Sequence, residues 1–237
     1  MEKRLAVEAV VFDFWNTLFE AEIGTREYHR ARARALYETL LEEGLSPSLE
    51  KVERAYLEAR RICDRIRRAT EREVPVEGEV SVMLHLMGLE EEILNALVEA
   101  YLRPFREYLR PVEGAEEVLR ALDELGFRIG MLSNTMCGRA NREVLERYDL
   151  LRYFDALVFS DELGYRKPNP MAFIEVLEEL DVLPAEAVMV GDEEADVLGA
   201  LECGLAAILF KRGVADIPRG EFEVVEKLGD ILELIYR

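Results

Sequence analysis

The chain has 237 residues, half of them apolar, which is enough to bury a core without disulfides or structural metals. Its 49 acidic and 30 basic residues give a formal charge of −19, and so acidic a surface repels nucleic acid and anionic lipid. It has no apolar run of about 18 residues, and Glu8 and Asp13 interrupt any signal-peptide core. We therefore expect neither a membrane protein nor a nucleic-acid-binding protein.

The cysteines and the amide residues bear on where the protein works. Cys63, Cys137 and Cys203 are far apart, odd in number and in no metal-binding spacing, which favours a reducing cytoplasm. The chain lacks glutamine and has few asparagines among many charges, which hints at a heat-adapted source.

The first predicted element is a strand at 9–14, a continuous apolar run typical of a parallel strand covered on both faces. Residues 21–109 then show no strand pattern and indicate three or four helices. The clearest helix covers about Leu49 to Thr70, where apolar residues recur every three or four positions along one stripe. Ser48 is its expected N-cap. A helical block inserted after a first strand is typical of a cap over an α/β domain.

Strands and helices alternate in the rest of the chain, which is typical of a parallel sheet with crossover helices. The expected strands are 127–133, 156–160, 187–192 and 206–210, and the expected helices are 113–125, 139–148, 170–180 and 193–203. Pro170 at a helix start and Gly126 and Gly204 after helix ends fit this pattern. We predict an α/β core formed by 1–20 and 110–237, with an all-helical cap at 21–109.

Polar residues follow four of the predicted strands, at the edge where open α/β sheets bind ligands. They are Asp13, then Ser133 with Asn134, then Lys167, then Asp192 with Asp196. If they converge, the carboxylates suit Mg²⁺, and the hydroxyl and the lysine suit the oxygens of a phosphoryl group.

These segments resemble the motifs of the haloacid dehalogenase superfamily, in order and in spacing, over essentially the whole chain. The most specific are Gly-x-x-Lys-Pro-x-Pro at 164–170 and Gly-Asp-x-x-x-Asp-x-x-Gly-Ala at 191–200. The resemblance implies a Rossmann-like parallel sheet and a C1-type helical cap at the position of the insert. It also implies a hydrolase.

The resemblance further implies a role for each matching residue. Asp13 would be the nucleophile that forms a covalent aspartyl intermediate. Ser133 and Asn134 would bind the transferred group, and Lys167 would neutralise its charge. The implied ligands of Mg²⁺ are Asp13, Asp192 and the backbone carbonyl of Trp15, with Asp196 either near the metal or orienting the lysine.

Trp15 departs from the pattern of the family's phosphatases. They carry an acid/base Asp two residues after the nucleophile, and an indole has one N–H and does not titrate usefully. Asn16 stands where glycine is usual, and asparagine tolerates positive φ. We place Trp15 and Asn16 among the substrate-binding residues.

The expected function is a cytoplasmic, Mg²⁺-dependent phosphatase that acts on a small phosphorylated or otherwise anionic molecule. One alternative is a 2-haloacid dehalogenase-type hydrolase of carbon–halogen bonds. That branch has tyrosine at the position of Trp15, but it lacks the metal and the Gly-Asp motif seen here. The other alternative is a catalytically weak protein that binds a phosphorylated metabolite.

The cap contributes one further pattern. Seven arginines but only three acids lie between Arg54 and Arg72. We expect a solvated face with i,i+4 pairs such as Arg60–Asp64 and Arg67–Glu71. The alternative is that one of Arg61, Arg65 and Arg68 binds an anionic substrate. His29 and His85 have no partner at metal-ligand spacing, so we expect structural or solvated roles for both.

Overall fold

The computed structural model describes residues 4–211 and 219–237. The chain forms two compact units. The core unit comprises 1–20 and 111–237, and the cap unit comprises 21–110. Two short strands that pair with one another, β3 (Phe19–Ala21) and β4 (Leu109–Pro111), carry the chain between the units. No helix in the described part of the chain is both long and apolar enough to cross a membrane.

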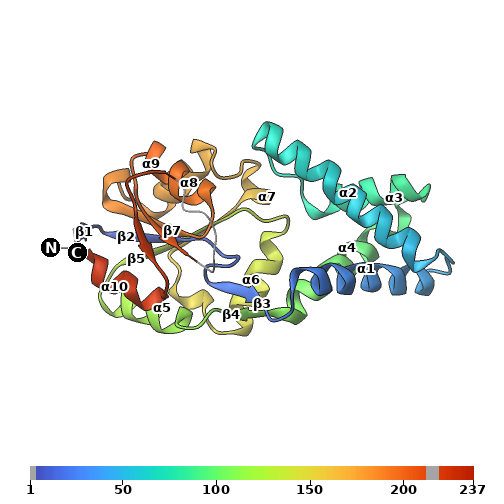
Figure 1. The fold of residues 1–237 in the computed structure, drawn as a ribbon, viewed down its shortest axis with the longest axis horizontal. Helices are drawn as coiled ribbons and strands as arrows, with labels where there is room; N and C mark the ends of the chain where they lie inside the picture. Colours follow the sequence, from blue (N-terminus) through green and yellow to red (C-terminus); the bar gives the residue numbers. More distant parts are fainter. Residues whose placement is uncertain (1–3, 212–218) are drawn as a thin grey trace. The chain divides into compact units, whose positions relative to one another are not determined.

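The core unit is built on a six-stranded parallel sheet (Figure 1). In the order in which they pair, the strands are β6 (Ala156–Phe159), β5 (Arg128–Ser133), β2 (Ala9–Phe12), β7 (Ala187–Gly191), β8 (Ala206–Phe210) and β9 (Glu223–Val225). Every residue of β2 and β7 is buried, which explains their continuous apolar runs. The predicted α/β class and parallel sheet are confirmed.

Helices cover both faces of this sheet. They are α5 (Ala115–Glu124), α6 (Gly138–Arg147), α7 (Ser160–Leu163), α8 (Pro170–Leu180), α9 (Glu194–Glu202) and α10 (Ile231–Leu234), with 3₁₀ turns η2 (Leu151–Tyr153), η3 (Pro184–Glu186) and η4 (Leu228–Asp230). Phe173 of α8 and Val197 of α9 pack with Val11 and Met189 of the sheet. Helices α5 and α10 lie on the opposite face (Figure 1).

Some short elements were not predicted. β9 is an edge strand of three residues that includes a charged side chain, and β1 (Leu5–Ala6) and β10 (Ile235–Tyr236) are a pair of two-residue strands. None of them is long enough to show a periodicity.

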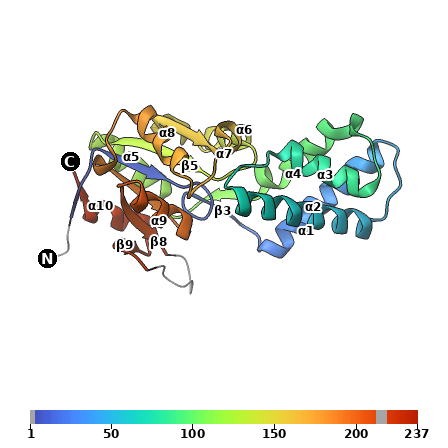
Figure 2. The same ribbon diagram turned by 90° about the horizontal axis from the view of Figure 1, so that it is seen from above.

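The cap unit consists of four α-helices, α1 (Thr25–Glu42), α2 (Leu49–Thr70), α3 (Val76–Met87) and α4 (Leu94–Tyr108), with a 3₁₀ turn η1 (Glu91–Ile93) (Figure 2). The bounds and the N-cap predicted for α2 are confirmed, since the Ser48 hydroxyl accepts the N–H of Lys51 at 3.2 Å. Val52 and Cys63 of the expected apolar stripe are buried, but its last members, Ile66 and Ala69, are exposed. The helices of the cap pack mainly on one another, as an all-helical unit requires.

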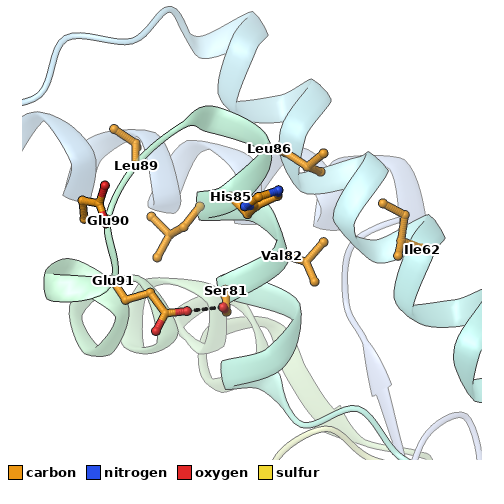
Figure 3. A pocket seen from close by; sticks show the side chains of 9 residues that line it. Ile62, Ser81, Val82, His85, Leu86, Leu89, Glu90 and Glu91 are labelled. Atoms are coloured by element: carbon orange, nitrogen blue, oxygen red, sulfur yellow. Dashed lines mark hydrogen bonds between the residues drawn. The ribbon is translucent and has the colours of Figure 1, made fainter.

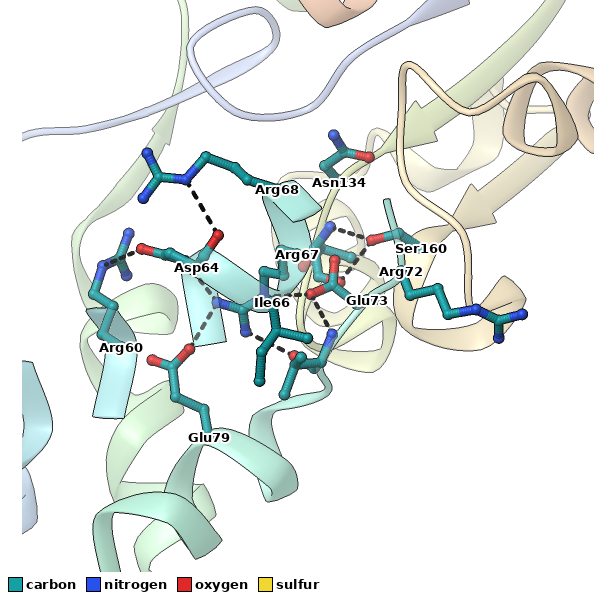
Figure 4. Close-up of polar contacts among 12 residues, drawn as sticks. Arg60, Asp64, Ile66, Arg67, Arg68, Arg72, Glu73, Glu79, Asn134 and Ser160 are labelled. Carbon is teal, nitrogen blue, oxygen red and sulfur yellow. Dashed lines mark hydrogen bonds and ion pairs between the residues drawn. The ribbon is translucent and has the colours of Figure 1, made fainter. Parts of the chain in front are cut away.

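One prediction for the arginines of α2 is wrong. Arg67, which we expected on a solvated face, is 5% exposed and contacts the carboxylates of Asp64, Glu73 and Glu79 at 2.7–2.8 Å (Figure 4). It lies eight residues after Ala59 and four after Cys63, both buried, so it continues the buried face of the helix. The other expected pair, Arg60–Asp64, is present at 3.7 Å.

Candidate active site

The carboxylates that follow β2 and β7 meet at the carboxyl edge of the sheet, because these two strands are direct neighbours. Asp13 comes after the last residue of β2, and its N–H donates to the carbonyl of Val190 at 2.9 Å. One carboxylate oxygen from each of Asp13, Asp192 and Asp196 lies within 4.8 Å of the others. Such a group of oxygens is suited to a divalent cation.

Lys167 lies beside these carboxylates and is buried. Its ammonium donates to Asp13 Oδ1 at 2.5 Å, to the Leu132 carbonyl at 2.6 Å and to Asp196 Oδ1 at 2.7 Å. An ammonium has three N–H groups, so these contacts use all of them. The lysine is therefore fixed against both the Asp13 carboxylate and the end of β5.

Asp196 uses both of its carboxylate oxygens within the core unit. Oδ1 contacts Lys167, and Oδ2 accepts the N–H of Glu193 at 3.0 Å in a capping box at the start of α9. A Cβ at Gly191 would lie 2.2 Å from Oδ2, so only glycine admits this carboxylate. Of the two roles considered for Asp196, the contacts favour orienting the lysine.

Asp192 is held by two residues from the turn after β2. The Thr17 hydroxyl is 3.5 Å from Asp192 Oδ1, and the side chain of Asn16 also hydrogen-bonds to this carboxylate. Asn16 adopts φ 58°, as expected for a position where glycine is usual. Thr17 is fully buried and was missed in the sequence, where a single threonine at a strand end carries no signal.

The charges of the cluster do not balance, because three carboxylates share one ammonium. Burial raises the pKa of Asp13 against the opposing effect of Lys167. Burial, followed by the charges of Asp196 and Glu193, raises the pKa of Asp192 to about 7. Burial lowers the pKa of Lys167, but the neighbouring Asp13 and Asp196 outweigh it and the net shift is upward. A divalent cation would relieve this excess of negative charge, so the donor set fits one.

The remaining predicted residues lie at the same strand ends. Ser133 is buried and is the last residue of β5. The side-chain amide of Asn134 hydrogen-bonds to the backbone of Lys167. Trp15 is half-buried in the turn after Asp13 and forms a backbone bridge with Phe19.

A second network, missed in the sequence, anchors the loop that follows β5. The Ser160 hydroxyl accepts the N–H of Thr135 at 2.9 Å and donates to its carbonyl at 3.0 Å. The carboxylate of Asp161 accepts the N–H of Gly138 at 3.0 Å, at the start of α6. These contacts bind the loop after β5 to the end of β6.

The cap contains a hollow of about 460 Å³ between α2, α3 and η1 (Figure 3). Its walls include Ile62, Val82 and Leu86, with Glu90 and Glu91 also lining it. None of the residues predicted for the site lines this hollow.

A strand-end nucleophile candidate, a buried lysine and a carboxylate cluster on a parallel sheet define a class of α/β hydrolases. The chain belongs to the haloacid dehalogenase-like hydrolase family, whose model matches residues 7–204.

Two relatives resemble the chain in sequence, and one solved structure resembles it in fold. It is 31% identical over 210 residues to a glyceraldehyde 3-phosphate phosphatase from Methanopyrus kandleri, covering 87% of this chain and 85% of the relative. It is 30% identical to an enzyme of the same name from Methanothermobacter thermautotrophicus, covering 94% and 92%. It also shares the fold of a 2-haloacid dehalogenase from Pseudomonas syringae pv. Tomato DC3000, with a TM-score of 0.71, 22% identity and coverage of 96% and 97%.

Proposed function

We propose that this protein is a Mg²⁺-dependent phosphatase of small phosphorylated molecules, with Asp13 as the nucleophile. The observation that carries the proposal is the buried cluster in which Lys167 contacts Asp13 while Asp192 and Asp196 lie beside them. The two relatives named glyceraldehyde 3-phosphate phosphatase support a phosphorylated substrate of few carbon atoms.

The contacts of Asp13 suggest which oxygen reacts. Lys167 holds Oδ1, so we assign Oδ2 as the atom that attacks phosphorus. The new Oδ2–P bond forms as the bond from phosphorus to the leaving oxygen breaks and its electron pair leaves with that oxygen. Water then attacks phosphorus as the Oδ2–P bond breaks, which releases inorganic phosphate and restores the Asp13 carboxylate.

Lys167 has one role before the reaction and another when Asp13 carries the phosphoryl group. Before reaction its three N–H groups are all engaged, one of them by Asp13. When Asp13 carries a phosphoryl group, this N–H is placed to donate to a phosphoryl oxygen, while Asp196 and the Leu132 carbonyl keep the ammonium in place.

The residues that would hold Mg²⁺ are Asp13, Asp192 and the backbone carbonyl of Trp15. When bound, the ion supplies positive charge against the oxygens of the phosphoryl group. Ser133, at the end of β5, is placed to bind one of these oxygens through its hydroxyl.

The three free cysteines support a reducing compartment, and we propose the cytoplasm.

A panel of phosphoesters, assayed with Mg²⁺ and with EDTA, tests this function. We expect phosphate release that EDTA abolishes and that Asp13→Asn abolishes in the presence of Mg²⁺. Asp123→Asn removes an exposed carboxylate elsewhere in the core unit and serves as the matched control. Release of halide from 2-haloacids that is insensitive to EDTA would instead support the dehalogenase alternative.

A further inference from the structure

The side chain of Asn134 is turned toward the backbone of Lys167, 33 residues further along the chain. Its Oδ1 accepts the N–H of Lys167 at 2.8 Å, and its Nδ2 donates to the carbonyl of the same residue at 3.0 Å. The backbone N–H needs an acceptor and the backbone C=O needs a donor. This pair of bonds therefore also determines which terminal atom of the Asn134 amide is oxygen and which is nitrogen. The Asn134 amide therefore forms the same two hydrogen bonds with the Lys167 backbone that the backbone of a paired strand would form.

A second contact holds the other end of the lysine. The Leu132 carbonyl, two residues before Asn134, accepts from the Lys167 ammonium at 2.6 Å. Residues 132–134 at the end of β5 thus bind Lys167 by its backbone and by its charged tip. A lysine has a flexible four-carbon stem, so fixing both ends restricts where its nitrogen can lie.

Few side chains could replace Asn134 in this contact. Aspartate has a similar shape but no donor for the Lys167 carbonyl, and its charge would face that oxygen. Serine has a single oxygen and a shorter reach, and glutamine is longer by one methylene group. The requirement for one donor and one acceptor at this distance is specific to asparagine.

We infer that Asn134 is a positioning residue, whose amide holds Lys167 against Asp13 and Asp196 instead of contacting the substrate. This inference departs from the substrate-binding role that the family resemblance implies for Asn134. Its catalytic consequence rests on the proposed phosphatase function, but its structural consequence does not.

The structural consequence can be measured without any substrate. The side chain of Lys167 is 2% exposed, so acetic anhydride should acetylate it slowly, as followed by mass spectrometry of the peptide that contains it. We expect Asn134→Ala and Asn134→Asp to raise the rate of acetylation at least tenfold. Asn169→Ala is the matched control, because it removes an asparagine side chain of the same loop that accepts the N–H of Met171 at the start of α8. An unchanged rate in both Asn134 variants would overturn the inference.

The catalytic consequence is tested by a double-mutant cycle. Displacing a catalytic group by about 1 Å costs roughly 100-fold in rate, so we expect Asn134→Ala to lower kcat by about 10- to 100-fold with little change in KM. In Lys167→Ala, the further change Asn134→Ala should have almost no effect, because residues that act through one another are not additive. Additive losses with a raised KM would instead show that Asn134 contacts substrate. A wild-type protein that hydrolyses no phosphoester would defeat the proposed function, while the acetylation experiment would still decide the role of Asn134.

Discussion

The resemblance to the family implies that Trp15 stands where its phosphatases carry the acid that protonates the leaving group. Such an acid contributes about 10²–10⁴-fold when the leaving group is poor. We therefore predict that alkyl phosphates, whose alkoxides need a proton, react at least 100-fold more slowly than p-nitrophenyl phosphate or an acyl phosphate. The measurement is kcat/KM across phosphoesters of graded leaving-group pKa.

Two substitutions at this position separate the missing acid from other causes. Trp15→Asp supplies a carboxyl group and should flatten the dependence on leaving-group pKa, whereas Trp15→Phe should leave its slope as steep as in the wild type. Fast hydrolysis of alkyl phosphates by the wild-type protein would show that another residue donates the proton.

The sequence was informative about single residues where a motif specified both type and spacing. Asp13, Lys167, Asp192 and Asp196 were proposed from their motifs. The fold brings Lys167 into contact with Asp13 and Asp196, and brings one oxygen of each of the three carboxylates within 4.8 Å of the others. Pairings between distant segments were not predictable in this way. The bond from Thr17 to Asp192 spans 175 positions and depends on the fold of the sheet, which no local pattern records.

Helix α2 shows how one element can carry arginines in two very different environments. Arg67 binds Glu73 and Glu79, whose side chains are 1% exposed, whereas Arg61 pairs with Glu58 on the surface. We expected both on a solvated face, although Arg67 falls four residues after Cys63 of the apolar stripe. The periodicity of the sequence could not show that acids from the segment after α2 and from α3 turn inward to meet Arg67.

We predict that Arg67→Met destabilises the cap unit by about 3 kcal/mol or more, because it leaves two buried carboxylates without a countercharge. Arg61→Met is the matched control on the same helix and should leave unfolding unchanged, since its ion pair is exposed to solvent. Urea unfolding of both variants, followed by circular dichroism, measures the difference. Equal effects of the two substitutions would contradict the role given to the Arg67 network.

We expect His29 to make the stability of the cap depend on pH. Its Nδ1 is 2.6 Å from the Tyr56 hydroxyl, and burial, followed by Arg60 and Arg32, lowers its pKa from 6.5 to about 4. Between these values the unfolded chain binds a proton that the folded chain does not, so stability falls as the pH drops from about 6.5 to about 4.

We predict that His29→Gln loses less stability than the wild type over this interval. Allowing for the partial exposure of His29, we expect a difference of roughly 1–2 kcal/mol. Urea unfolding at pH 7 and at pH 5 measures it, and comparing the two proteins cancels the titration of the many carboxylates they share. Identical losses of stability in the two proteins would show that His29 of the folded protein is already protonated at pH 5.

Across the whole molecule, the strands that the sequence revealed were those buried on both faces, since continuous apolar runs such as 187–191 result from that environment. The sequence could not give the order of the strands in the sheet. The neighbours of β2 are β5 and β7, which lie far along the chain, and this order determines which strand ends share an edge. The resemblance to a known family indicated which residues would share this edge, but no strand order was predicted.

The net charge of −19 and the unbalanced carboxylates at the site lead to one prediction for the whole molecule. A cation that binds the folded chain and not the unfolded one stabilises it, by about 2.7 kcal/mol at one hundred times Kd. We expect Mg²⁺ to raise the unfolding temperature of the wild type by several degrees, in excess of any effect of NaCl at matched ionic strength. Asp192→Asn should abolish that excess, because it removes a carboxylate from the proposed metal site, whereas Asp123→Asn should retain it. A shift of equal size with NaCl would mean that Mg²⁺ only screens the acidic surface, and the metal site would have to be abandoned.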